Sequence, residues 1–282
     1  MVDEQYINGT YYKRYSHPEN KHLIFLLPGQ SMGPRSFWDF KLPEGKTHSE
    51  YFLEAGIDVI LFDPIGYGKS TEFYSYDRVG YAKQIVDVTK TITKEYTNKS
   101  ILGFSTSTSP ALIAAESGYF NKLIFHSPAI IRTTGKPLIK IDEVFESDMN
   151  RLKDIRIGKA SDMLIPKSNK LDGWEEAITE VVKTYTGYKN GYWRCPGSVV
   201  GDVDNYYSVN GADGFDISKI NADVLTMVGQ YDFEMYLPHV DLPWIIRTLH
   251  PKFVNIPNST HFSMWENNCH LTRKEIIDFL IT

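Results

Sequence analysis

Serine side chains gather in the stretch ILGFSTSTSPALIAA (residues 101–115), where Ser105 and Ser107 lie between an apolar run and a helix-like run. A serine hydroxyl becomes a nucleophile when an imidazole removes its proton and a carboxylate holds that imidazole. The chain offers both partners further on, because Asp232 ends DVLTMVGQYD and His261 lies in NSTHFSMWE. Alone, the stretch is equally consistent with a serine-rich turn. With Asp232 and His261, it predicts a nucleophile.

The choice between the serines depends on the size of their neighbours. A nucleophile on a sharp strand-to-helix turn needs small residues two positions before and two after it. Gly103 and Ser107 flank Ser105 in this way. Ser107 has small flanks too, in Ser105 and Ser109, but its turn would place Pro110 only three residues on. We prefer Ser105 because Gly103 lies inside the predicted strand.

The acid and the base are chosen by position relative to strands. His261 follows the last predicted strand, whereas His126 lies within one. Asp232 ends a predicted strand, whereas Asp223 begins it and would lie at the wrong edge of the sheet. The fallback candidates for the acid are Glu234 and Asp241.

Acyl transfer also needs two backbone N–H groups that face the developing negative charge. We expect one from Thr106 and the other from Gln30, where Gly29 permits a tight turn. The alternative for Gln30 is a side-chain contact with the substrate. The GYGKS loop (residues 66–70) lacks phosphate-binding spacing, and no metal-ligand spacing is found. No cofactor and no metal are therefore expected.

Short apolar runs that end in turn residues predict parallel strands covered on both faces. Four such runs span residues 22–29, 58–64, 100–105 and 122–128. Two further strands are predicted at 223–232 and 252–258, and helical segments at 49–55, 77–96, 109–117, 237–249 and 271–280. Asn8-Gly9 marks a hairpin in residues 6–15. This alternation predicts an open α/β sheet with helices on both faces, whose carboxyl edge collects the catalytic groups.

The alternation stops at a polar, aromatic-rich segment and then resumes. We interpret residues 130–221 as a cap inserted over the carboxyl edge, and residues 1–129 and 222–282 as the core. The candidates for a substrate pocket are Ser31, Tyr188, Trp193 and Tyr206.

Bulk properties exclude several partners. The chain has 282 residues and a formal charge of −5, which gives no reason to expect nucleic acid. No apolar run approaches the roughly 20 residues of a membrane span, and the first residues lack the apolar region of a signal peptide. Cys195 and Cys269 are too few for a disulfide framework. We expect a cytoplasmic protein with two free thiols; one bridge between them, and the oligomeric state, stay open.

These motifs resemble the α/β-hydrolase superfamily over about residues 22–129 and 221–282. The stretches that carry the resemblance are PGQS, FDPIGYGKS, GFSTS, GQYD and NSTHF. The resemblance implies an α/β-hydrolase fold with a cap after the sixth strand. It also implies Ser105 as nucleophile, Asp232 as acid, His261 as base, and Thr106 and Gln30 as oxyanion donors. Two departures stand out: Pro28-Gly29 replaces the usual His-Gly, and Ser107 replaces the second glycine of the G-x-S-x-G pattern.

A serine nucleophile resembles esterases and thioesterases rather than dehalogenases. The expected function is cleavage of a small-molecule carboxylic ester through an acyl-enzyme on Ser105. The alternatives are a thioesterase or acyltransferase with the same triad, and a non-catalytic binding protein on the same scaffold.

Overall fold

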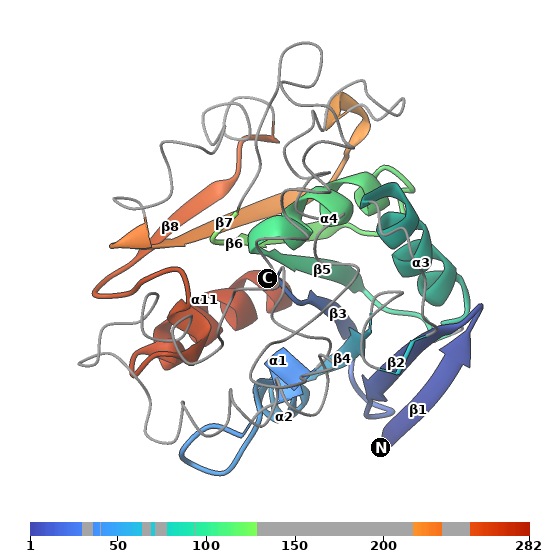
Figure 1. Ribbon diagram of the computed structural model, residues 1–282, viewed down its shortest axis with the longest axis horizontal. Coiled ribbons are helices and arrows are strands. Elements are labelled where there is room, and N and C mark those ends of the chain that lie inside the picture. Colours follow the sequence, from blue (N-terminus) through green and yellow to red (C-terminus); the bar gives the residue numbers. More distant parts are fainter. Residues whose placement is uncertain are drawn as a thin grey trace, which may run out of the picture.

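The computed structural model describes residues 1–29, 36–39, 41–63, 69–70, 78–92, 94–128, 217–232 and 249–282. Within these residues, eight strands form one sheet in the order β1-β2-β4-β3-β5-β6-β7-β8 (Figure 1). The strands are β1 (Val2–Ile7), β2 (Thr10–Tyr15), β3 (His22–Leu27), β4 (Ile57–Phe62), β5 (Asn98–Phe104), β6 (Lys122–His126), β7 (Asp223–Gly229) and β8 (Lys252–Ile256). β3 to β8 pair in parallel, so the prediction of an open parallel sheet is confirmed.

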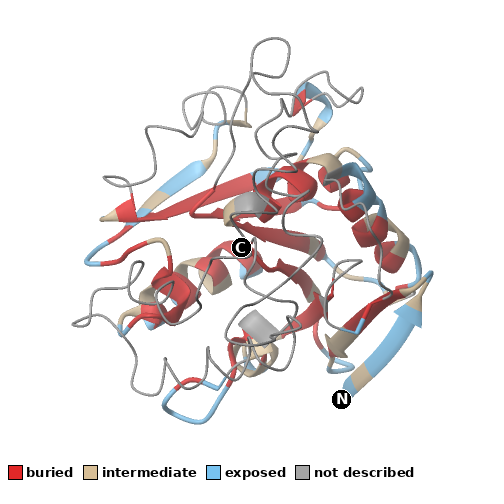
Figure 2. Ribbon diagram, viewed as in Figure 1, coloured by how far each residue is buried: buried red, intermediate tan, exposed pale blue. Residues whose placement is uncertain are grey.

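The two edges of the sheet are built differently from its centre. β1 and β2 form an antiparallel hairpin whose turn residues Asn8 and Gly9 have φ of 49° and 80°, as the dipeptide predicts. β1 at one edge is mostly exposed (Figure 2). β8 at the other edge exposes Phe253, and Ile256 is the one buried residue of this strand.

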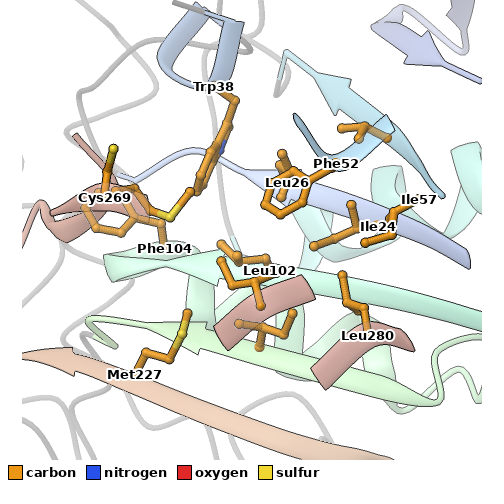
Figure 3. Packing of buried hydrophobic residues seen from close by; sticks show 14 of the residues in the cluster. Ile24, Leu26, Trp38, Phe52, Ile57, Leu102, Phe104, Met227, Cys269 and Leu280 are labelled. Atoms are coloured by element: carbon orange, nitrogen blue, oxygen red, sulfur yellow. The ribbon is translucent and has the colours of Figure 1, made fainter. Parts of the chain in front are cut away.

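Helices cover both faces of the sheet. α3 (Arg78–Lys90) and α4 (Thr108–Ala115) lie on one face, and α2 (His48–Glu54) and α11 (Cys269–Ile281) lie on the other, with the short α1 (Ser36–Asp39) beside α2 (Figure 1). Each face has its own apolar cluster. The cluster under α2 and α11 packs Trp38, Phe104 and Cys269 against the ends of the central strands (Figure 3).

The long predicted helix at residues 77–96 ends earlier, at Lys90. The residues beyond it turn toward the amino end of β4 and bind the buried carboxylate of Asp58. The Lys94 Nζ lies 3.0 Å from Asp58 Oδ2, and the Tyr96 hydroxyl donates to the same oxygen at 2.6 Å. A continuous helix would carry both side chains away from this carboxylate. The predicted helices at 49–55, 109–117 and 271–280 are confirmed as α2, α4 and α11.

The predicted cap falls between β6 and β7, which are parallel neighbours in the sheet. Residues 129–216 lie outside the described residues, so the cap and the domain boundaries stay predictions. The predicted helix at 237–249 lies outside them too, except for its last residue. Among the described residues, no helix has the length and apolar character needed to cross a bilayer.

Candidate active site

The turn after β5 forces Ser105 into an unusual backbone conformation. β5 ends at Phe104, a 3-10 turn spans Ser105–Ser107, and α4 begins at Thr108. Ser105 has φ of 53°, in the left-handed region that non-glycine residues rarely occupy. Such a conformation costs on the order of 1–3 kcal/mol and persists only where its surroundings enforce it.

Close packing enforces this conformation from two sides. A Cβ on Gly103 would lie 2.7 Å from Thr108 Cα, so only glycine lets α4 start this close to β5. A Cβ on Gly29 would lie 2.7 Å from Phe104 Cδ1 and 3.4 Å from Ser105 Cβ. The end of β3 therefore runs directly beside the turn. The Thr108 hydroxyl also donates to the Ser105 carbonyl at 2.7 Å and closes the turn.

The two competing serines have different environments. Ser107 is buried, and its hydroxyl donates to the Pro28 carbonyl at the end of β3. Ser105 is partly exposed, and it alone of the two has the left-handed φ. Ser107 thus replaces the second glycine of the pattern and uses its hydroxyl to hold the turn against β3. This difference favours Ser105 as the reactive residue.

The loops after β7 and β8 bring Asp232 and His261 together. His261 Nδ1 lies 2.9 Å from Asp232 Oδ1, and the Asp232 side chain is 4% exposed. An Nδ1–H that donates to a carboxylate leaves Nε2 with the lone pair that a general base needs. The aspartate and the histidine chosen from the sequence are therefore hydrogen-bonded partners, although 29 residues separate them.

An aromatic floor links the serine turn to the histidine. Phe104, the residue before Ser105, is buried, and its ring centroid lies 5.1 Å from that of His261. The Phe104 ring centroid also lies 5.0 Å from that of His126, the residue opposite Phe104 on the neighbouring strand β6. Since Phe104 directly precedes Ser105, its ring contact with His261 links the Ser105 turn to the loop that carries this histidine.

The structure is similar to several solved structures. An esterase from Exiguobacterium antarcticum matches with a TM-score of 0.69 and 18% identity, over 99% of this chain and 98% of that one. A bromoperoxidase from Bacillus anthracis matches with a TM-score of 0.66 and 15% identity over the whole of both chains. An epoxide hydrolase, CorEH, matches with a TM-score of 0.67 and 16% identity, over 99% of this chain and 98% of that one. The chain has the α/β-hydrolase fold. No family model and no curated protein matches the sequence.

Of the two predicted oxyanion donors, Thr106 lies within the described residues and Gln30 does not. Thr106 lies in the 3-10 turn directly after Ser105, so its backbone N–H is next to the expected nucleophile. Gln30 lies outside the described residues, but Gly29 before it runs beside Ser105. The pocket candidates Ser31, Tyr188, Trp193 and Tyr206, and the fallback acids Glu234 and Asp241, also lie outside them. These assignments stay predictions.

The FDPIGYGKS stretch has a structural role at its two ends. The Lys69 N–H donates to Asp63 Oδ2 at 2.8 Å, and the Ser70 hydroxyl donates to the Asp63 carbonyl at 2.5 Å. The Ser70 oxygen also accepts the Tyr11 N–H at 2.8 Å, which ties the turn to β2. Residues 64–68 between them lie outside the described part. Since the polar groups at both ends are committed to backbone, the tight-turn interpretation is favoured over phosphate binding.

Two buried polar residues near the site are missed by sequence reasoning. His126 is buried in β6, as predicted, and its Nε2 lies 2.7 Å from Ser263 Oγ. Burial lowers its pKa well below the usual range, and the nearby His261 and His48 lower it further. Glu266 is buried behind the histidine loop and accepts hydrogen bonds from Thr260. A glutamate five residues after His261, directly after the apolar residues Met264 and Trp265, was the available signal.

Proposed function

We propose that the protein is a serine hydrolase that cleaves a small carboxylic ester through an acyl-enzyme on Ser105. The left-handed Ser105 at the carboxyl end of β5 is the observation that carries this proposal. A strained residue between a strand and a helix presents its side chain outward, as acyl transfer requires. The adjacent His261–Asp232 pair supports the same chemistry.

In the first half of the reaction, His261 Nε2 takes the proton of the Ser105 hydroxyl while Oγ attacks the ester carbonyl carbon. The carbonyl oxygen becomes an oxyanion that the N–H groups of Thr106 and Gln30 stabilise. The carbon–oxygen bond to the alcohol then breaks, and the alcohol leaves with the proton from His261. Asp232 stabilises the positive imidazolium that forms during these steps.

In the second half, water attacks the acyl carbon and His261 takes its proton. The bond to Ser105 Oγ breaks, His261 returns the proton to Oγ, and the carboxylic acid is released. No cofactor or metal enters this scheme. The esterase from Exiguobacterium antarcticum shares the fold, which adds support for an ester as the substrate class.

The test is a panel of p-nitrophenyl esters and acyl thioesters of increasing chain length, measured on wild type and Ser105→Ala. We expect ester turnover that Ser105→Ala lowers by about 10⁴-fold or more without a change in folding. A preference for thioesters, or for transfer to an added alcohol, would replace ester cleavage by the thioesterase or acyltransferase alternative. Turnover that survives in Ser105→Ala would exclude the proposed nucleophile.

A further inference from the structure

A buried carboxylate lies directly behind the histidine loop. Glu266 follows the 3-10 turn η6 (Ser263–Trp265) and is 0% exposed. Its two oxygens accept the Thr260 N–H at 3.0 and 3.1 Å, and Oε1 also accepts the Thr260 hydroxyl. Thr260 is the residue before His261, so all three of these contacts hold the backbone that carries the base.

Burial of this carboxylate costs free energy unless hydrogen-bond donors replace the water that it loses. Burial raises the pKa of the Glu266 carboxyl, and the hydrogen bonds from Thr260 act in the opposite direction. Removing a carboxylate from water is compensated only by well-placed donors. Here the principal donors come from one residue of the histidine loop, rather than from a lysine or arginine.

The loop held by Glu266 is also joined to the loop of the acid. The Tyr231 N–H donates to the Ser259 carbonyl at 2.8 Å, and Tyr231 precedes Asp232. A Cβ on Gly229 would lie 2.1 Å from the Thr260 carbonyl oxygen, so the two loops are in backbone contact. A shift of Thr260 would therefore change the separation between His261 and Asp232.

We propose that Glu266 is a positioning residue for His261, which it holds against Asp232 by fixing both donors of Thr260. The inference rests on the proposed function, in which His261 is the base. Glu266 touches neither Ser105 nor Asp232 in any hydrogen bond of the described residues. Its effect on the reaction therefore runs through Thr260 and the orientation of the imidazole ring.

A purely structural role makes different predictions from this one. The Glu266 carbonyl accepts the Cys269 N–H at 2.8 Å at the start of α11, and that contact is made by the backbone whatever the side chain. Loss of a structural anchor would lower thermal stability and leave kcat of the folded molecules unchanged. Loss of a positioning contact lowers kcat with little change in KM.

The experiment compares Glu266→Gln, Thr260→Val and Thr260→Ser, with Glu275→Gln as the matched control. Glu275 lies on α11 and pairs with Lys252 at 2.8 Å, away from the histidine loop. Valine has the shape of threonine without the hydroxyl, whereas serine keeps the donor to Glu266. If Glu266→Gln does not fold, the two Thr260 variants still decide the question.

The readouts are kcat and KM on the best p-nitrophenyl ester, and the downfield proton NMR signal of the His261 Nδ1–H. We expect Glu266→Gln and Thr260→Val to lower kcat by about 10- to 100-fold, with KM unchanged within about twofold. We expect Thr260→Ser to keep most of the activity and Glu275→Gln to match wild type. The downfield signal should broaden or shift in the first two variants only.

The proposal is overturned if Glu266→Gln and Thr260→Val keep wild-type kcat, or if Thr260→Ser loses as much as Thr260→Val. An unchanged downfield signal in both would overturn it as well. The NMR signal needs no substrate and no nucleophile. If Ser105→Ala shows the proposed function to be wrong, the signal therefore still tests whether Glu266 positions the imidazole.

Discussion

The buried histidine His48 predicts a specific loss of stability in acid. Its ring is 0% exposed and packs against Trp38 and Trp265, with centroid distances of 6.3 and 6.0 Å. Burial, and then the charge of Arg273 next to it, lowers the pKa of His48 from 6.5 to about 3. The Arg273 Nη1 lies 3.4 Å from His48 Nδ1, so a second positive charge would be placed beside the first.

The magnitude follows from proton linkage. Between pH 6.5 and about 3, the unfolded chain binds a proton at His48 and the folded protein does not. The free energy of unfolding then falls by about 1.4 kcal/mol for each pH unit below 6.5, and above 6.5 this effect is absent. At about pH 5, His48 alone therefore removes roughly 2 kcal/mol. His126, whose pKa is also lowered, acts in the same direction.

The assay is urea unfolding of wild type, His48→Leu and His270→Gln at about pH 7, 6 and 5. Leucine cannot take up a proton and suits the surrounding apolar cluster. Between about pH 7 and 5, we therefore expect the unfolding free energy of His48→Leu to fall by about 2 kcal/mol less than that of wild type. His270 is exposed on α11, and its variant should follow wild type. The reasoning is refuted if His48→Leu and wild type lose the same free energy of unfolding on acidification.

The remaining predictions concern the site and its supports. Gly103→Ala places a Cβ 2.7 Å from Thr108 Cα, so we expect it to lower ester kcat/KM more than tenfold while unfolding free energy drops by about 1–3 kcal/mol; equal kcat/KM would contradict the packing argument. Asp232→Asn should lower kcat by about 10⁴-fold, since it removes the negative partner of His261, and steady-state kinetics that show a loss below tenfold would argue for another acid. Asp58→Asn should lower the unfolding free energy by about 3 kcal/mol, because Asp58 is buried among cationic and hydroxyl donors, and leave kcat unchanged, as it lies at the opposite edge of the sheet.

The central strands could be predicted because their residue pattern is typical of strands buried on both faces. The runs that form β3, β5 and β6 are apolar without alternation, and turn residues end each of them. The end of α3 could not be predicted, since its periodicity continues past Lys90. The competing signal is Asp58, which becomes a buried partner of Lys94 and Tyr96 only once β4 is in the sheet.

The candidate site was predictable where strand ends decide it and not where long-range contacts do. His261 and Asp232 follow from the positions of β7 and β8 alone. The position of Gly103 in the sequence favours Ser105 over Ser107, but the hydrogen bond that occupies the Ser107 hydroxyl goes to the Pro28 carbonyl, 79 residues earlier in the chain. No local pattern carries that contact.

The most direct test of the proposed nucleophile is intact-mass spectrometry after treatment with a fluorophosphonate probe. Wild type, Ser105→Ala and Ser107→Ala are compared under the same conditions. We predict a single adduct on wild type and on Ser107→Ala, and none on Ser105→Ala. Loss of the adduct in Ser107→Ala alone would move the nucleophile two residues along the turn. An adduct that persists in Ser105→Ala, or no adduct on wild type, would contradict an activated Ser105.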